Sequence, residues 1–91
     1  MEDKGLIELY AELKIVADIN RLGILKFLKK RKEASVGEIA DNLKISFKAT
    51  SKHLLYLVRK GILMNKKDGP FVIYYISNNL PKLIQSVLDL I

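Results

Sequence analysis

The chain has 91 residues, a length that suits one domain over residues 1–91 with a modest hydrophobic core. It contains no cysteine, which excludes disulfides and thiolate metal sites and fits a reducing compartment. The formal net charge is +6, and charged or polar residues interrupt every apolar segment. Neither a signal peptide nor a membrane span is therefore expected, and a cytoplasmic location is predicted.

Two helices are predicted in the first third of the chain. Between residues 6 and 17 apolar side chains recur three and four positions apart, which indicates a helix with the stripe Leu6, Leu9, Tyr10, Leu13, Val16 and Ala17. Residues 18–21 break this pattern and begin a second helix, for which Asn20 or Asp18 is the candidate N-cap. That helix runs to Lys30 with Gly23 as a weak point, and residues 31–34 are interpreted as a polar connection.

A helix-turn-helix is predicted next. Ser35 and Glu38 have the spacing of a capping box, which begins a short helix with Ile39, Ala40 and Leu43 facing inward. A two-residue link then leads to a second helix over residues 46–60. Two short helices joined so tightly, the second basic on its outer face, are typical of this motif.

Both ends of the helix over residues 46–60 are marked in the sequence. Ser46 is a candidate N-cap, and Gly61 supplies the left-handed conformation that ends a helix. One face is assigned to the core and consists of Phe47, Thr50, Leu54, Leu57 and Val58. The other face carries Lys48, Ala49, Lys52, Tyr56 and Arg59. Lysines near the N-terminus of a helix suit entry into the DNA major groove, although an outer face of solvated lysines is the ordinary alternative.

A β-hairpin is predicted after Gly61. Residues 62–65 form a short apolar strand, residues 66–70 a turn with an Asp-Gly signal, and residues 71–76 a return strand. Such a hairpin directly after a helix-turn-helix is a wing, and its tip is expected to carry Lys66 and Lys67. In the return strand, one of Tyr74 and Tyr75 should point inward and the other outward.

A final helix is predicted from residue 80, with Pro81 in its first turn. Together, the first and last helices carry more apolar surface than a small domain can cover, so a homodimer formed by residues 6–17 and 80–91 is expected. The predicted interface consists of Leu6, Leu9, Tyr10, Leu13, Leu83, Ile84, Val87, Leu88 and Ile91. The fold class is thus mainly α with a β-hairpin, a winged helix-turn-helix of order α-α-α-α-β-β-α.

Charge is unevenly distributed along the chain. From Lys44 to Lys67 every charged residue is basic, which indicates a polyanionic partner. Nucleic acid is the first candidate. An anionic membrane surface is disfavoured because the apolar residues nearby are committed to a core. Lysines rather than aromatics and arginines dominate this window, which favours nucleic acid over an acidic protein partner.

Nearly the whole chain resembles the arsenic-repressor (ArsR) family of winged-helix transcriptional regulators. The resemblance is carried by Ala-Asp-Ile-Asn-Arg-Leu-Gly-Ile-Leu at 17–25, Val-Gly-Glu-Ile-Ala at 36–40, Ser-Lys-His-Leu at 51–54, Lys-Gly-Ile-Leu at 60–63 and Val-Ile-Tyr-Tyr-Ile at 72–76. It implies DNA binding and dimerisation. The chain departs from the family at Ile19, where the family has proline, and at Phe47, where it often has a polar residue. Metal-sensing members have a Cys-x-Cys or Asp, His and Glu ligands. Residues 35–37 have no cysteine and the last helix has only Asp89, so no metal site or cofactor is expected.

An enzyme is not expected. His53 is the only histidine, no glycine-rich phosphate loop precedes a helix, and no two carboxylates are placed for acid–base chemistry. The predicted function is a sequence-specific, homodimeric regulator of transcription, repressor or activator, on an inverted-repeat operator. Helix 46–60 would enter the major groove of double-stranded DNA, and wing residues 65–70 would contact its backbone or minor groove. The candidate DNA-binding residues are Ser46, Lys48, Ala49, Thr50, Ser51, Lys52, His53, Arg59, Lys66 and Lys67. A winged-helix module that docks a protein partner, without an operator, is the alternative.

Overall fold

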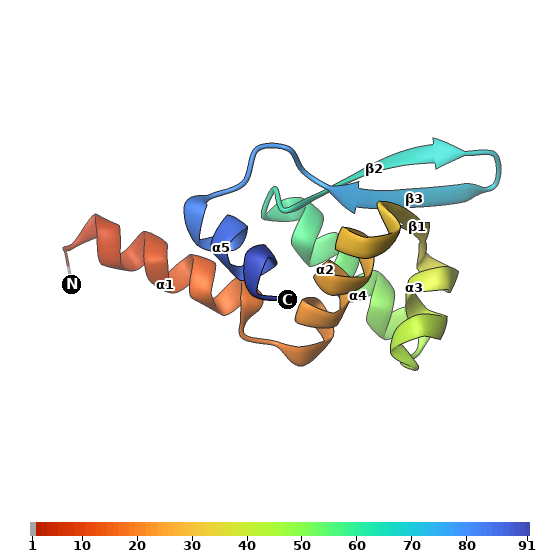
Figure 1. Cartoon of the computed structure of the whole chain (residues 1–91), viewed down its shortest axis with the longest axis horizontal. Helices are drawn as coiled ribbons and strands as arrows, with labels where there is room; N and C mark the ends of the chain where they lie inside the picture. Colours follow the sequence, from red (N-terminus) through yellow and green to blue (C-terminus); the bar gives the residue numbers. More distant parts are fainter. Residues whose placement is uncertain (1) are drawn as a thin grey trace.

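Five helices and a three-stranded sheet make up the computed structural model, which describes residues 2–91. In chain order the elements are α1 (Lys4–Val16), α2 (Ile19–Arg31), β1 (Glu33–Ser35), α3 (Val36–Leu43), α4 (Phe47–Arg59), β2 (Leu63–Asp68), β3 (Phe71–Ile76) and α5 (Lys82–Leu90). The molecule measures 45 × 23 × 22 Å. Its long axis runs from the N-terminal half of α1 at one end to the tip of the β2–β3 hairpin at the other (Figure 1).

Side-chain caps begin α2, α3 and α4 where the sequence places them. Asp18 Oδ1 accepts from the backbone N–H groups of Asn20 and Arg21 at 2.9 and 3.0 Å, so Asp18 rather than Asn20 is the N-cap of α2. The capping box between Ser35 and Glu38 is confirmed. Ser46 Oγ accepts from the N–H of Ala49 at 3.0 Å, which confirms Ser46 as the N-cap of α4.

The core lies between the helices and one face of the sheet. Its fully buried members come from α2, α3, α4, α5 and the segment that enters β2, and include Ile24, Leu25, Ile39, Leu54, Leu57, Ile62, Leu63 and Ile84. This packing explains why a glycine stands at position 23. A Cβ there would lie 3.1 Å from Leu43 Cδ2, closer than side chains normally approach. The absence of a side chain thus lets α2 and α3 pack closely, which offsets the lower helix propensity of glycine.

The predicted polar connection at residues 31–34 is wrong in part, because Glu33–Ser35 form strand β1. This strand pairs antiparallel with β3, with Ala34 opposite Tyr74, and the sheet order is β1-β3-β2. Ala34 and Tyr74 are buried while Tyr75 is partly exposed, which confirms the expected alternation of the two tyrosines. Three residues are too few to show the alternation of apolar and polar side chains that predicts a strand. Strand β1 can therefore be recognised only from its pairing with β3.

The hairpin is longer than predicted. Residues 66–68 belong to β2, where Lys66 lies opposite Ile73 and Lys67 opposite Val72, and only Gly69 and Pro70 connect the strands. Gly69 has φ +60°, a conformation that favours glycine. The prediction that Lys66 and Lys67 occupy the tip is therefore wrong. The strand ladder extends to Asp68 because the turn itself needs only two residues.

Candidate nucleic-acid interface

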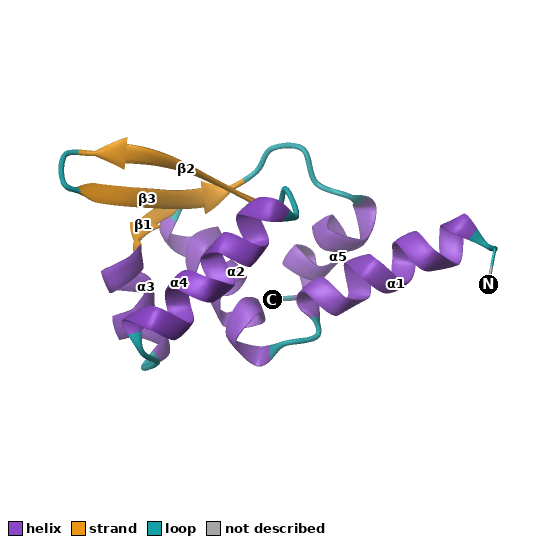
Figure 2. Ribbon diagram, turned by 180° about the vertical axis from the view of Figure 1, so that it is seen from behind, coloured by secondary structure: helices purple, strands orange, loops and turns teal. Residues whose placement is uncertain are grey.

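The outer face of α4 is basic and carries no compensating carboxylate. Lys48, Lys52 and Arg59 are exposed on it, and the sequence of α4 contains no acidic residue. Among residues 2–91 the ion pairs are Arg21–Asp18, Arg31–Glu38 and Lys66–Glu33, none of which involves α4. The positive charge of the helix is thus available to an external polyanion. The start of α4 lies at the same end of the molecule as the hairpin tip (Figure 2).

Two predictions about single residues of α4 are wrong, a DNA contact at Thr50 and a core position at Phe47, whereas the assignment of Thr50 to the core face is confirmed. Thr50 was a candidate DNA contact, but it is completely buried and its Oγ1 donates to the Ser46 carbonyl at 2.8 Å. It shares the core face with Leu54 and Leu57, four and seven residues on. Phe47 was assigned to the core, but it is 63% exposed. Phe47 is the first residue of α4, and its side chain borders a surface hollow together with Val36 and Phe71 instead of entering the core.

The remaining candidates on α4 are accessible to different degrees. Ser46 is exposed, although its hydroxyl oxygen already caps the helix. Ala49 and Ser51 are half-buried at the edges of the basic face. Among the candidates on α4, the lysines are therefore the most accessible, with Ser51 beside them.

His53 is half-buried on α4. The pKa of the Asp18 carboxyl is lowered, chiefly because the Arg21 backbone N–H donates to it. The charges of Arg21 and His53 lower this pKa further, while partial burial opposes the shift. His53 therefore lies near enough to the Asp18 carboxylate to act on it electrostatically.

Lys66 and Lys67 project from opposite faces of the hairpin, because successive side chains of a strand alternate. Lys66 Nζ lies 3.2 Å from Glu33 Oε2 and 5.7 Å from the centre of the Tyr75 ring. Lys67 is exposed and shares the face of the buried Leu63, four residues earlier, which is the face that packs on the helices. The sheet therefore separates two lysines that the sequence treats as one pair.

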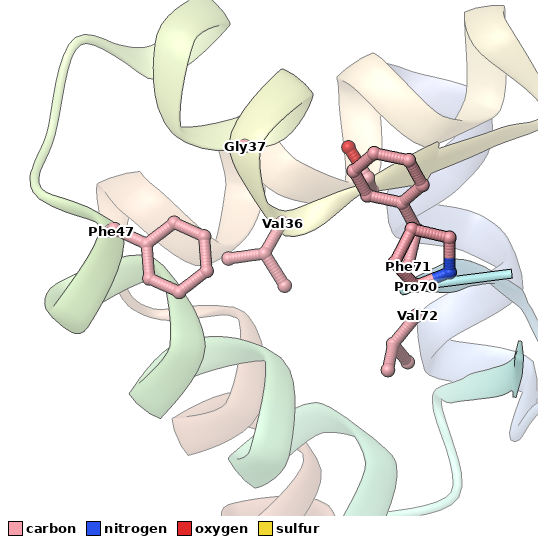
Figure 3. A pocket seen from close by; sticks show the side chains of 7 residues that line it. Val36, Gly37, Phe47, Pro70, Phe71 and Val72 are labelled. Atoms are coloured by element: carbon pink, nitrogen blue, oxygen red, sulfur yellow. The ribbon is translucent and has the colours of Figure 1, made fainter.

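An apolar hollow of about 320 Å³ lies beside the start of α4 and was not predicted (Figure 3). Its lining comes from the end of β1, the start of α3, the start of α4 and the wing: Ser35, Val36, Gly37, Phe47, Pro70, Phe71 and Val72. Phe47 and Val36 lie side by side, and Pro70 and Phe71 stand across the opening from them. Three segments far apart in sequence, residues 35–37, 47 and 70–72, form this hollow, so no local pattern predicts it.

Arg21 is a second feature that sequence reasoning missed. Its Nε donates to the Ile15 carbonyl at 2.7 Å and its Nη2 to the Lys14 carbonyl at 2.9 Å. Its guanidinium also stacks on Tyr56, 4.4 Å from the ring centre. Tyr56, which the sequence places on the outer face of α4, thus packs against Arg21 of α2. The available signal was the position of Arg21 within the stretch that resembles the arsenic-repressor family.

No group of three His, Cys, Asp or Glu side chains lies close enough within residues 2–91 to hold a metal ion. In the same part of the chain, no helix has both the length and the apolar content needed to cross a membrane.

The order of elements, the basic helix α4 and the adjoining hairpin define a winged helix-turn-helix protein. Residues 18–64 match the family model described as bacterial regulatory protein, arsR family. The chain therefore belongs to the ArsR family of bacterial regulatory proteins, as the sequence resemblance indicated.

Named relatives agree with this assignment. The chain is 34% identical over 76 residues to the arsenical resistance operon repressor of Escherichia coli, covering 84% of this chain and 65% of the relative. It is 40% identical over 65 residues to the cadmium resistance transcriptional regulatory protein CadC of Listeria innocua, covering 71% of this chain and 55% of that protein. The chain thus matches only part of the length of each relative.

Solved structures show the same fold. HlyU from Vibrio cholerae superposes with a TM-score of 0.81 at 32% identity, and the match covers 97% of this chain and 91% of that one. The fold match therefore includes α1 and α5, which lie outside the segment matched by the family model.

Proposed function

We propose that this protein is a DNA-binding transcriptional regulator, not an enzyme, and that it binds an inverted-repeat operator as a homodimer. The observation that carries the proposal is the outer face of α4, where Lys48 and Lys52 lie one turn apart near the helix N-terminus with no carboxylate paired to them. A recognition helix contacts base edges with its N-terminal residues. Membership of a family of regulatory proteins supports the same function.

Double-stranded DNA fits this surface better than the other polyanions. A single helix with lysines one turn apart can enter the major groove of B-form DNA. Double-stranded RNA presents a deep, narrow major groove that does not admit a helix. In this arrangement α4 would occupy the major groove, and the hairpin, which lies at the same end of the molecule, would contact the adjacent backbone or minor groove.

The apolar surface of α1 supports the homodimer. Large apolar residues are exposed along this helix, from Leu6 through Tyr10, which is 61% exposed, to Leu13. The N-terminal half of α1 extends past the other elements, and α5 lies beside its C-terminal half (Figure 1). Monomeric proteins rarely expose such a continuous apolar patch, so a second copy of the chain is the proposed cover.

One residue of the predicted interface is excluded. Ile84 is completely buried within its own domain, so it cannot contact a partner. Its neighbours Leu83, Val87, Leu88 and Ile91 are only half-buried, and Leu90 is 84% exposed. The proposed interface on α5 therefore consists of these residues around Ile84, together with α1.

The dimer is tested by sedimentation at tens of micromolar, roughly the range in which a weak dimer still forms. The wild-type protein should sediment as a dimer. Leu13→Glu, which places a charge on the exposed face of α1, should shift it to monomer. Met64→Glu is the matched control, because Met64 is equally apolar and exposed but lies on the sheet. A wild-type protein that is monomeric throughout would contradict the proposal.

The function is tested by selecting binding sites from random duplex DNA with the whole chain. Enrichment of an inverted repeat with half-sites about one helical turn, or about 34 Å, apart is expected. A selection that enriches no sequence would instead favour the protein-docking module, for which the hollow beside Phe47 offers an apolar surface. Acting on DNA, the protein would work in the cytoplasm of a prokaryotic cell.

A further inference from the structure

Arg21 connects the end of one helix to the side of another. It lies in the first turn of α2, and its side chain closes the C-terminus of α1 by donating to the Ile15 and Lys14 carbonyls. These carbonyls belong to the last turn of α1, where the backbone has no helical partner for them. Asp18 holds the arginine from the other side, with Oδ2 3.7 Å from Nη1.

The same guanidinium contacts the recognition helix. It lies 4.4 Å from the centre of the Tyr56 ring, in the range where a cation is attracted to an aromatic face. Tyr56 is in the third turn of α4, and the Lys60 ammonium lies 5.6 Å from the same ring. One planar group therefore touches both the end of α1 and the third turn of α4.

Arg21 itself is poorly placed to bind DNA. Its side chain is only 16% exposed, and its donors point at two backbone carbonyls and a carboxylate. A phosphate could compete for it only if these contacts broke. Its contribution must therefore pass through the elements that it joins.

We propose that Arg21 is a positioning residue that, through Tyr56, fixes the orientation of α4 relative to the dimerisation helix α1 and so sets the half-site spacing that the protein accepts. This inference rests on the proposed homodimeric DNA binding. In a two-fold dimer, any rotation of α4 against α1 occurs in both subunits. The two rotations add, so the separation and relative angle of the two recognition helices change by twice the effect of one subunit. The Arg21 guanidinium, which contacts both α1 and α4, limits that rotation.

The test compares variants on operators of different spacing. The selected inverted repeat is synthesised with its original spacing and with one base pair added or removed, which shifts one half-site by about 3.4 Å and about 34°. A duplex with a single half-site reports the affinity of one recognition helix. Arg21→Lys keeps the charge but loses the fork, and Tyr56→Leu removes the ring while leaving the α1 carbonyl contacts in place.

Two matched controls isolate the effect of the Arg21–Tyr56 contact. Tyr56→Phe keeps the aromatic face. Arg31→Lys makes the same change at another arginine of α2, which pairs with Glu38 at 2.6 Å and lies 5.4 Å from the Phe27 ring but does not join α1 to α4. Both controls should behave as wild type, and thermal melting of every variant separates loss of fold from loss of positioning.

The wild-type protein should lose about tenfold or more in affinity on the altered spacings, comparable to one mismatched base pair. Arg21→Lys and Tyr56→Leu should reduce that discrimination to about threefold or less, with single half-site binding unchanged. If both variants keep the wild-type spacing profile, or the wild type itself has no spacing preference, the inference is overturned while DNA binding stands. If no duplex is bound at all, the proposed function fails with it.

Discussion

Lys66 and Lys67 are adjacent in the sequence, yet Lys66 pairs with the Glu33 carboxylate at 3.2 Å while Lys67 projects from the opposite face of the hairpin. Strand alternation therefore gives two neighbouring charges different surroundings. Lys67→Ala should weaken binding to all DNA sequences alike and lower the salt slope by about one, as expected for one lost phosphate contact. Lys66→Ala should change the affinity and the salt slope less, because the Glu33 carboxylate already partly compensates the charge of Lys66.

The measurement is the affinity for random duplex DNA at several salt concentrations. Glu33→Gln serves as control, since it frees Lys66 from its partner and should strengthen non-specific binding slightly. Equal losses for the two lysine variants would show that strand position does not decide which lysine contacts DNA.

Lys48 and Lys52 should contribute more to specific than to non-specific DNA affinity, unlike the lysines of the wing. Replacing either with Ala should cost specific binding about 1–3 kcal/mol if it contacts guanine. Non-specific binding should fall less, because it depends on summed charge. Competition between the operator and random DNA at two salt concentrations distinguishes these effects. If helix and wing variants lower both affinities equally, α4 is not the reading element.

Leu54 and Leu55 provide a matched pair for the orientation of α4. Leu54 is completely buried, whereas Leu55 is 48% exposed. Leu54→Ala should lower the free energy of unfolding by about 2–5 kcal/mol, through lost burial and the cavity left behind. Leu55→Ala should cost much less. Denaturant unfolding of both variants checks this, and a Leu54→Ala protein as stable as wild type would mean that α4 is rotated.

Asp18 should make the stability of α2 dependent on pH. The backbone N–H of Arg21 lowers the pKa of this carboxyl below its usual 3.8. Because the pKa is lowered in the folded state, the ionised carboxyl stabilises the fold at pH values above its usual pKa. This stabilisation is lost as the pH falls through the folded-state pKa. Asp18→Ala should therefore cost about 0.5–2 kcal/mol at neutral pH, as expected for a lost N-cap.

The difference between wild type and Asp18→Ala should shrink when unfolding is measured near pH 2. Asp18→Asn is the control, because its amide caps the helix without titrating. The explanation would fail if the cost of Asp18→Ala were the same at neutral and acid pH.

Metal ions should not control DNA binding in this chain, although two relatives are named for arsenical and cadmium resistance. The chain has no cysteine and one histidine, and two copies of His53 on separate recognition helices would stand apart in a dimer. Stoichiometric zinc, cadmium or arsenite should leave the operator affinity unchanged in a titration. A large loss of binding on adding any of the three would reveal a metal site.

Features that depend on neighbouring residues followed from the sequence alone. The caps at Ser35 and Ser46 arise from side chains and N–H groups three residues apart. Helix α4 ends just before Gly61 because a glycine accepts a positive φ. The helical spacing of apolar residues likewise predicted that Leu54 and Leu57 are buried. Each of these interactions lies within one or two turns of chain.

Tertiary structure decided the features whose partners are distant in the sequence. Strand β1 exists because the edge of β3 offers it hydrogen bonds, and the same pairing register places Lys66 and Lys67 on opposite faces. Phe47 is exposed because its side chain faces an open hollow between α3 and the wing instead of the core. Arg21 meets Tyr56 because the fold brings the first turn of α2 against α4. Local periodicity reports which residues share a face of one element. Which faces meet depends on the packing of the whole chain, and there the free energy of burying a surface outweighs any local preference.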